Sequence, residues 1–141
     1  MLQSASYQNS AVVTSNRVGI IVMLYEGAIN FLEAAVNSIE RDDIPGKGLY
    51  IDKASAIISE LLCALDQKEG GEVAVNLEKL YNYMLGELTE ANTTNNHMPV
   101  RTVISLMKEL KMGWDEAARQ SFSDPKAAQS ASTMHGKQMS A

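Results

Sequence analysis

The sequence predicts an all-α protein that folds as an antiparallel up-down-up-down four-helix bundle. Apolar residues recur with the 3.6-residue period of an α-helix in four segments, and Gly, Pro and Asn concentrate in the breaks between them. No segment shows the alternating pattern of a β-strand. Because the breaks are short, successive helices are expected to run antiparallel. A chain of 141 residues is the usual size of one domain.

The first helix is expected to begin after residues 14–16 and to run to about Arg41. The side chains of those three polar residues can accept hydrogen bonds from the free N–H groups of a first helical turn. A turn is predicted over residues 42–48, because Pro45 disfavours helical geometry in the residue before it and Gly46 and Gly48 permit a reversal. The apolar stripe of this helix comprises Ile21, Leu24, Ala28, Phe31, Leu32, Ala35 and Ile39.

Three further helices are expected at about Leu49–Asp66, about Glu72–Asn92, and from a first turn that contains Pro99 to about Gln120. Residues 67–71 are predicted to form the turn between the second and third helices. Pro99 is tolerated in the first turn of the fourth helix because its missing N–H has no helical partner there. The fourth helix carries a heptad-like seam, in which Trp114 is expected to be a core residue. The stripes comprise Ile51, Ala54, Ile58, Leu61 and Leu65, then Leu77, Leu80, Tyr81, Met84, Leu88 and Ala91, and finally Val100, Val103, Met107, Leu110, Trp114 and Ala117.

These boundaries divide the chain into a flexible N-terminal segment (residues 1–15), a four-helix bundle domain (residues 16–120) and a disordered tail (residues 121–141). The tail is rich in Ser, Ala, Gln and Lys and holds few large apolar groups. Such a segment buries too little surface to offset the entropy lost on ordering.

The composition argues against several functional classes. A net charge of -5 with no basic run is unsuited to nucleic acid, which proteins bind with clustered Lys and Arg. Cys63 is the single cysteine, so no disulfide framework or Cys-based metal site is expected. The first 15 residues do not resemble a secretion signal, and the apolar run from Val18 to Tyr25 is much shorter than the ~20 residues that span a bilayer. We expect a cytoplasmic protein without membrane insertion.

The sequence also offers little that could carry catalysis or bind a metal or cofactor. No Glu-x-x-His pair of the kind that binds di-iron centres in bundles is present, and the two histidines, His97 and His135, fall in a predicted turn and in the tail. We expect neither an enzyme nor a cofactor, although a helical phosphotransfer or cofactor-binding protein remains the alternative from another functional class.

The first helix is apolar all the way round from Ile20 to Tyr25, whereas a bundle helix needs an apolar stripe on one face only. At 100° per residue, Ile20 and Met23 lie to one side of that stripe. The surplus surface can be covered by the N-terminal segment around Tyr7, by a second copy of the chain, or by a partner helix. The residues alone leave these three readings open, and a purely structural dimer is among them.

Three blocks of sequence resemble the flagellar secretion chaperone family. The first block is Tyr7, then 13–15 (Val-Thr-Ser), then 22–28 (Val-Met-Leu-Tyr-Glu-Gly-Ala) with Phe31 and Leu32. The second runs from Leu65-Asp66 through Gly71-Glu72, Ala74, Asn76-Leu77, Leu80-Tyr81, Tyr83-Met84 and Leu88 to Ala91-Asn92, and Trp114 resembles the closing aromatic. The resemblance covers about residues 7–118. Asn16-Arg17 departs from the proline common at the start of the family's first long helix.

The resemblance implies a cytoplasmic helical bundle that binds the disordered C-terminal segment of flagellin. It also implies that binding prevents premature polymerisation of flagellin and supports its delivery to the flagellar type III export apparatus. For Tyr81 and Met84 the spacing favours a core position, whereas Tyr83 lies opposite the stripe of its helix. The residues expected to contact a partner are Tyr7, Ile20, Met23, Tyr25, Tyr81, Tyr83 and Met84.

Overall fold

The computed structural model describes the backbone of residues 10–123 and the side chains of residues 17–120. Within this part of the chain there are four α-helices and no strand: α2 (Ser10–Glu40), α3 (Ile44–Cys63), α4 (Gln67–Thr94) and α5 (Met98–Ser123). The predicted all-α bundle is confirmed. Residues 1–9 of the predicted flexible segment and residues 124–141 of the predicted tail lie outside the described part.

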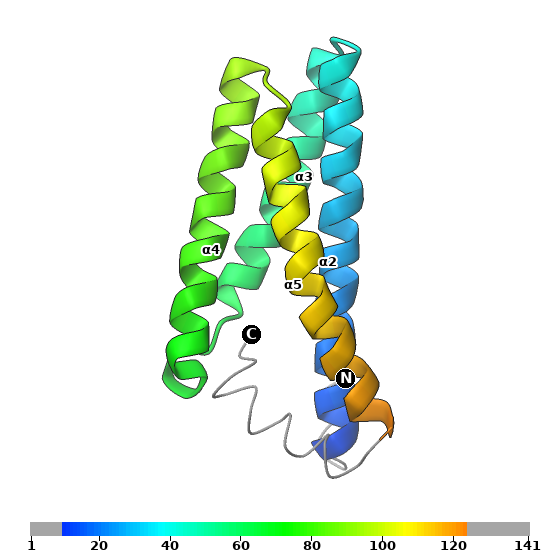
Figure 1. Ribbon diagram of the computed structural model, residues 1–141, viewed down its shortest axis with the longest axis vertical. Helices are drawn as coiled ribbons and strands as arrows, with labels where there is room; N and C mark the ends of the chain where they lie inside the picture. Colours follow the sequence, from blue (N-terminus) through cyan, green and yellow to red (C-terminus); the bar gives the residue numbers. More distant parts are fainter. Residues whose placement is uncertain (1–9, 124–141) are drawn as a thin grey trace.

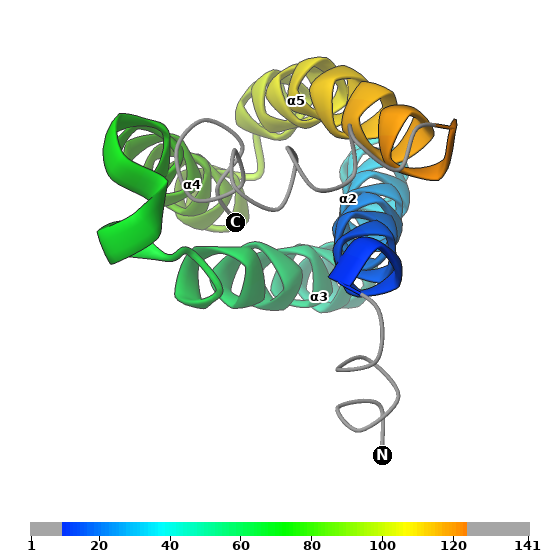
Figure 2. The ribbon, with the colours of Figure 1, turned by 90° about the horizontal axis from the view of Figure 1, so that it is seen from below.

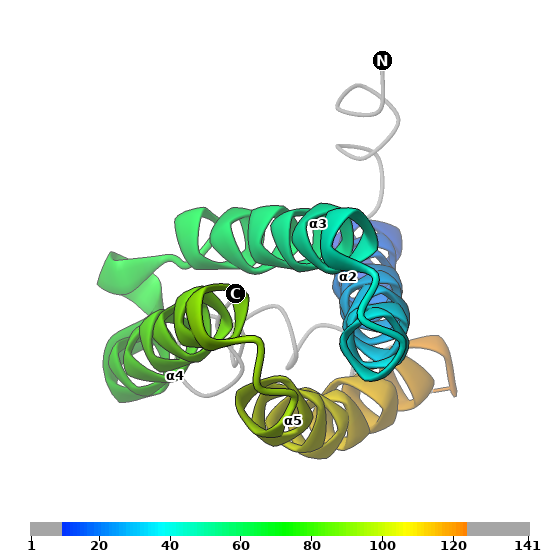
Figure 3. The ribbon, with the colours of Figure 1, turned by 90° about the horizontal axis from the view of Figure 1, so that it is seen from above.

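The four helices form a ring around one core. The helix pairs in contact are α2 with α3, α2 with α5, α3 with α4, and α4 with α5. Seen along the bundle, α2 and α4 stand at opposite corners, as do α3 and α5 (Figures 2 and 3). In Figure 1 the α2–α3 and α4–α5 connections lie at the top, and the α3–α4 connection lies at the bottom. This is the predicted up-down-up-down order.

Two helices begin earlier in the sequence than predicted. Helix α2 begins at Ser10 rather than after residues 14–16. Helix α3 begins at Ile44 rather than Leu49, because the Asp43 side chain accepts a hydrogen bond from the Gly46 backbone N–H at 3.1 Å and so caps the first turn. Pro45 then occupies a position where its missing N–H costs nothing. The reversal occurs at Asp42, where φ is 55°, at the start of the predicted turn. Residues 44–48 of that turn are helical, so this part of the prediction was wrong.

The third helix also begins before its predicted start at Glu72. Asp66 accepts a hydrogen bond from the Glu69 N–H at 3.0 Å, which caps a helical turn where the sequence predicted a loop. Gly71 then interrupts the helical geometry, with φ 56° and ψ -134°, a conformation suited to glycine. Helix α4 ends at Thr94, followed by Asn95 in the left-handed conformation. Helix α5 ends at Ser123, slightly beyond the predicted Gln120.

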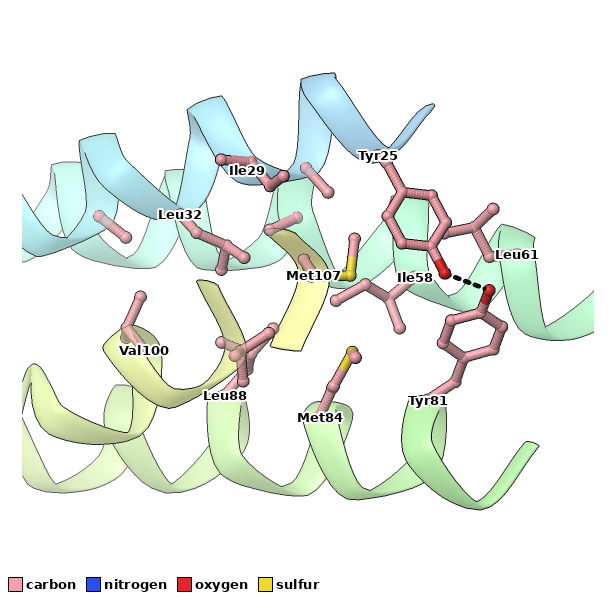
Figure 4. Close-up of a cluster of buried hydrophobic side chains, with 14 of the residues drawn as sticks. Tyr25, Ile29, Leu32, Ile58, Leu61, Tyr81, Met84, Leu88, Val100 and Met107 are labelled. Carbon is pink, nitrogen blue, oxygen red and sulfur yellow. Dashed lines mark hydrogen bonds between the residues drawn. The ribbon is translucent and has the colours of Figure 1, made fainter. Parts of the chain in front are cut away.

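The core lies between the four apolar stripes. Tyr25, Leu32, Ile58, Met84, Leu88 and Met107 are among its fully buried side chains (Figure 4). Trp114 is buried, as its place in the heptad-like seam predicted. One cation is also buried: Lys47 Nζ donates a 2.9 Å hydrogen bond to the Asn92 carbonyl oxygen in the last turn of α4. A cation at this end of a helix complements its dipole and satisfies an otherwise free carbonyl.

Helix α2 resembles a membrane-spanning helix in length and hydropathy. From Arg17 to Glu40 it is long and apolar enough to span a membrane, with a mean hydropathy of 1.5 in the most apolar window. In this fold α2 supplies nine buried apolar side chains to the core, from Val18 to Ile39. A central helix of a bundle passes the same test of length and composition.

Candidate partner-binding surface

Helix α2 carries exposed apolar side chains on its outer face. The exposed fractions of Ile20 and Met23 are 51% and 68%, as their position beside the core stripe predicted. Tyr83 on α4 is 49% exposed, in agreement with its place opposite the stripe of that helix. Because α2 and α4 stand at opposite corners of the ring, the structure does not bring Tyr83 together with the two α2 residues (Figure 2).

The other predicted contact residues are not accessible. Tyr25, Tyr81 and Met84 have an exposed fraction of 0% and form part of the core. This corrects their assignment to a partner surface, because no partner can reach them in this conformation. Tyr25 lies four residues after Ile21 and three before Ala28, so helical geometry places it on the stripe itself. Tyr7 lies outside the described residues.

Tyr25 and Tyr81 join the diagonal helices α2 and α4 across the core. Their hydroxyl oxygens are 2.6 Å apart and share a hydrogen bond (Figure 4). The Tyr25 ring also lies 6.4 Å from the Trp114 ring, centroid to centroid. Burial raises the pKa of Tyr25 above its ordinary value, and burial together with the neighbouring Tyr25 hydroxyl raises that of Tyr81. Both phenols are thus held neutral, and their roles are structural.

Apolar and aromatic contacts close the seam between α2 and α3. The Phe31 and Tyr50 rings stack with centroids 6.3 Å apart, and the Lys53 ammonium lies 5.7 Å from the Phe31 centroid. A side chain at Gly27 would reach the Ile57 methyl group at 3.5 Å, so the two helices approach closely there. Phe31, Tyr50 and Ile57 are partly buried. Ile20 and Met23 lie seven and four residues before Gly27, so helical geometry places both near the line of Gly27, toward the start of α2.

Sequence reasoning missed the α3 residues of this surface. Tyr50 and Ile57 are seven residues apart and flank the α3 stripe, a spacing that places them on one side of the helix. This seven-residue spacing could have shown that Tyr50 and Ile57 form one apolar side of α3 next to its core stripe. Nothing in the sequence shows that this flank faces α2.

The opposite flank of α2 is polar. Glu26, Glu33 and Glu40 are spaced by seven residues and pair with Lys111, Lys108 and Arg101 of α5 at 3.5, 3.3 and 2.9 Å. A polar groove of about 620 Å³ follows this seam, with Glu33, Lys108 and Arg101 in its walls. The two flanks of α2 therefore differ in character: ion pairs line the α5 side, and apolar groups line the α3 side.

The two histidines, His97 and His135, were considered above for metal binding and catalysis. His97 lies between α4 and α5, where its Nδ1 accepts a 3.0 Å hydrogen bond from Arg101 Nε. His135 lies outside the described part of the chain. Among the residues that the structure describes, no cluster of three or more His, Cys, Asp or Glu side chains could hold a metal ion.

Comparison with known proteins gives a consistent result. Residues 1–121 match the family described as flagellar protein FliS. The flagellar secretion chaperone FliSB of Pseudomonas aeruginosa is 43% identical over 104 residues, which cover 74% of this chain and 82% of that protein. The flagellar secretion chaperone FliS of Salmonella typhimurium is 36% identical over 108 residues, 76% of this chain and 80% of that protein. The FliS chaperone of Bacillus subtilis is 29% identical over 119 residues, 84% of this chain and 88% of that protein. The fold and these matches together show that the chain belongs to the FliS family of flagellar secretion chaperones.

Proposed function

We propose that this protein is a cytoplasmic export chaperone that binds the disordered C-terminal segment of flagellin, prevents its premature polymerisation and supports its delivery to the flagellar type III export apparatus. The observation that carries the proposal is the exposure of Ile20 and Met23 at the edge of the apolar α2–α3 seam. Family membership supports the flagellar client.

Binding in this scheme needs no nucleotide or metal. An amphipathic segment of the client lays its apolar face along the α2–α3 seam and covers the exposed parts of Ile20 and Met23. Each Å² of apolar surface removed from water contributes roughly 25 cal/mol, and ordering the client opposes part of this gain. A client segment held in this way is unavailable for contacts within a filament. Tyr83 marks a second contact point on α4, which a long extended client can reach by passing around the bundle.

Calorimetric titration with flagellin tests the proposal. Full-length monomeric flagellin is expected to bind, and flagellin that lacks its C-terminal segment is not. Two single variants then locate the contact. Met23 and Met112 are exposed to similar fractions, 68% and 71%, but Met112 lies on α5. Met23→Lys should weaken binding at least tenfold, and Met112→Lys should leave it unchanged. Equal binding of intact and truncated flagellin would refute the client assignment.

A second copy of this chain is the competing occupant of the same apolar surface. Sedimentation of the isolated protein distinguishes the two readings. A stable dimer that Met23→Lys dissociates, together with no binding of flagellin, would favour the dimerising bundle instead.

A further inference from the structure

The methionines of the described bundle fall into two groups. Met84 and Met107 have an exposed fraction of 0% and lie inside the core (Figure 4). Met23, Met98 and Met112 have exposed fractions of 68%, 56% and 71%. In the folded protein, an oxidant dissolved in water therefore reaches the sulfur atoms of the second group and not those of the first.

The surroundings of the three exposed methionines differ. The neighbours of a side chain on a helix surface are three and four residues away. Those of Met112 are all charged: Lys108, Glu109, Asp115 and Glu116. Met98 is the first residue of α5, and its neighbours within that helix are the polar residues Arg101 and Thr102. Both sulfur atoms are thus set among polar groups.

Met23 lies between two glycines instead. Gly19 and Gly27 are four residues before and after it, so neither carries a side chain that could cover the Met23 sulfur. A Cβ atom at Gly19 would have no neighbour within 4 Å among the described residues, so the helix surface is open there. Ile20, three residues before Met23, is apolar and half exposed, and the Glu26 carboxylate, three residues after, pairs across to α5. The Met23 thioether is therefore open to water and lies in an apolar patch.

We propose that Met23 is a site of reversible oxidation, at which hydrogen peroxide converts the thioether to a sulfoxide and thereby weakens the binding of flagellin. This inference rests on the proposed function, in which a segment of flagellin covers Met23. It adds a chemical modification that changes the affinity of that surface without changing the fold.

The peroxide alone balances the reaction. A lone pair of the Met23 sulfur attacks one peroxide oxygen, the O–O bond breaks and an S–O bond forms. The other oxygen leaves as hydroxide and becomes water by taking the proton of the transferred oxygen. The sulfur loses two electrons, which the peroxide gains. Methionine sulfoxide reductases reverse the change: two thiols become a disulfide, and the sulfoxide oxygen leaves as water.

The sulfoxide acts on binding because it is polar. In the free protein its oxygen stays in water, so the bundle keeps its stability. Under an apolar segment of flagellin the same oxygen would lose its water without gaining a donor. The apolar contribution of a Met side chain that is 68% exposed corresponds to roughly fivefold to thirtyfold in affinity. We expect a loss of that size on oxidation.

Mild peroxide treatment of the full chain tests the proposal. The peroxide is destroyed with catalase, the oxidised residues are identified by mass spectrometry of proteolytic peptides, and flagellin binding is measured by calorimetric titration. Met23 should be oxidised before Met84 and Met107, and affinity for flagellin should fall roughly fivefold to thirtyfold. Treatment with methionine sulfoxide reductases should restore it.

Two variants assign the effect to one residue. Each is titrated before and after peroxide, so any effect of the substitution itself cancels in the ratio. Met98→Leu/Met112→Leu should stay as sensitive to peroxide as the natural chain, and Met23→Leu should be insensitive, because leucine does not form a sulfoxide. Equal sensitivity of the two variants, or a Met23 sulfoxide that binds flagellin as tightly as the thioether, would overturn the inference.

Protection by flagellin separates the inference from the function on which it rests. Saturating flagellin should slow oxidation of Met23 roughly fivefold or more and leave that of Met112 unchanged. If flagellin binds but does not protect Met23, the modification site is wrong while the client stands. If untreated protein does not bind flagellin, the proposed function fails.

Discussion

Replacing Ile20 and Met23 by lysine should separate folding from client binding. Both side chains are about half exposed or more in the free protein, so the charged lysine heads remain in water and the bundle core is untouched. Surface substitutions of this kind usually change stability by less than about 0.5 kcal/mol each. The double variant should therefore keep its helicity by circular dichroism and unfold at nearly the same denaturant concentration.

The effect on binding follows from the exposed fractions. Full burial of an Ile or Met side chain contributes roughly 1.5–3 kcal/mol, so covering the exposed 51% and 68% contributes about 2.5 kcal/mol for the pair. That amount corresponds to about seventyfold in affinity, and covering two charges adds a further cost. We expect at least a hundredfold weaker binding of the flagellin C-terminal segment by isothermal titration calorimetry.

The chain offers a matched control for this experiment. Ile44 and Met98 are the same residue types with similar exposed fractions, 53% and 56%, but they lie at the first positions of α3 and α5. Ile44→Lys/Met98→Lys should bind flagellin normally. The reasoning is refuted if both double variants lose affinity equally, if Ile20→Lys/Met23→Lys unfolds, or if it folds and binds with unchanged affinity.

Three predictions concern the core. Because burial raises the pKa of Tyr25 and Tyr81, unfolded chains lose these protons above about pH 10 while folded chains keep them. The free energy of unfolding should thus be constant below that pH and fall above it by about 1.4 kcal/mol per pH unit for each phenol. Urea unfolding at several pH values, with tyrosinate absorbance to follow ionisation, measures this. A free energy of unfolding that does not fall above about pH 10 would contradict the reasoning. Trp114→Ala should cost on the order of 3 to 5 kcal/mol in urea unfolding, and a loss below about 1 kcal/mol would contradict its core position. Gly46→Ala should lower the free energy of unfolding by about 1 kcal/mol or more. The new methyl group would lie 2.7 Å from the buried Ser38 hydroxyl oxygen and would displace the Asp43 carboxylate that caps α3. An unchanged melting temperature would show that the turn adapts at no cost.

Much of the fold could be predicted because the decisive signals are local. The 3.6-residue stripes identified the four helices, and angular position on α2 identified Ile20 and Met23 as exposed. The errors at helix starts also have local causes. Asp43 and Asp66 are good N-cap residues, yet the nearby glycines and proline were given more weight as turn signals.

The misassigned residues show a different limit. The run from Ile20 to Tyr25 is apolar on every side, so composition alone does not separate its core positions from its exposed ones. Tyr25 is buried because Tyr81, 56 residues later, and Trp114 meet it across the core. The 3.6-residue period places Tyr25 and Tyr81 on the stripes of their helices, but it does not show that their hydroxyl groups meet across the core.

The sequence by itself determined the helical class of this protein, the number of helices in the described bundle, the stripe that each helix turns inward and the family to which the chain is similar. Only the tertiary structure decided which flank of α2 faces α3 and which faces α5. The sequence pattern of an up-down-up-down bundle is compatible with either handedness of the helix ring. In a ring of the opposite hand, α3 and α5 would exchange places beside α2, with Phe31 against α5 and Glu33 against α3. The physical reason is that periodicity fixes directions within one helix, whereas the neighbour on each flank is chosen by packing and by charge pairs between helices, such as Glu33 with Lys108, that are far apart in the chain.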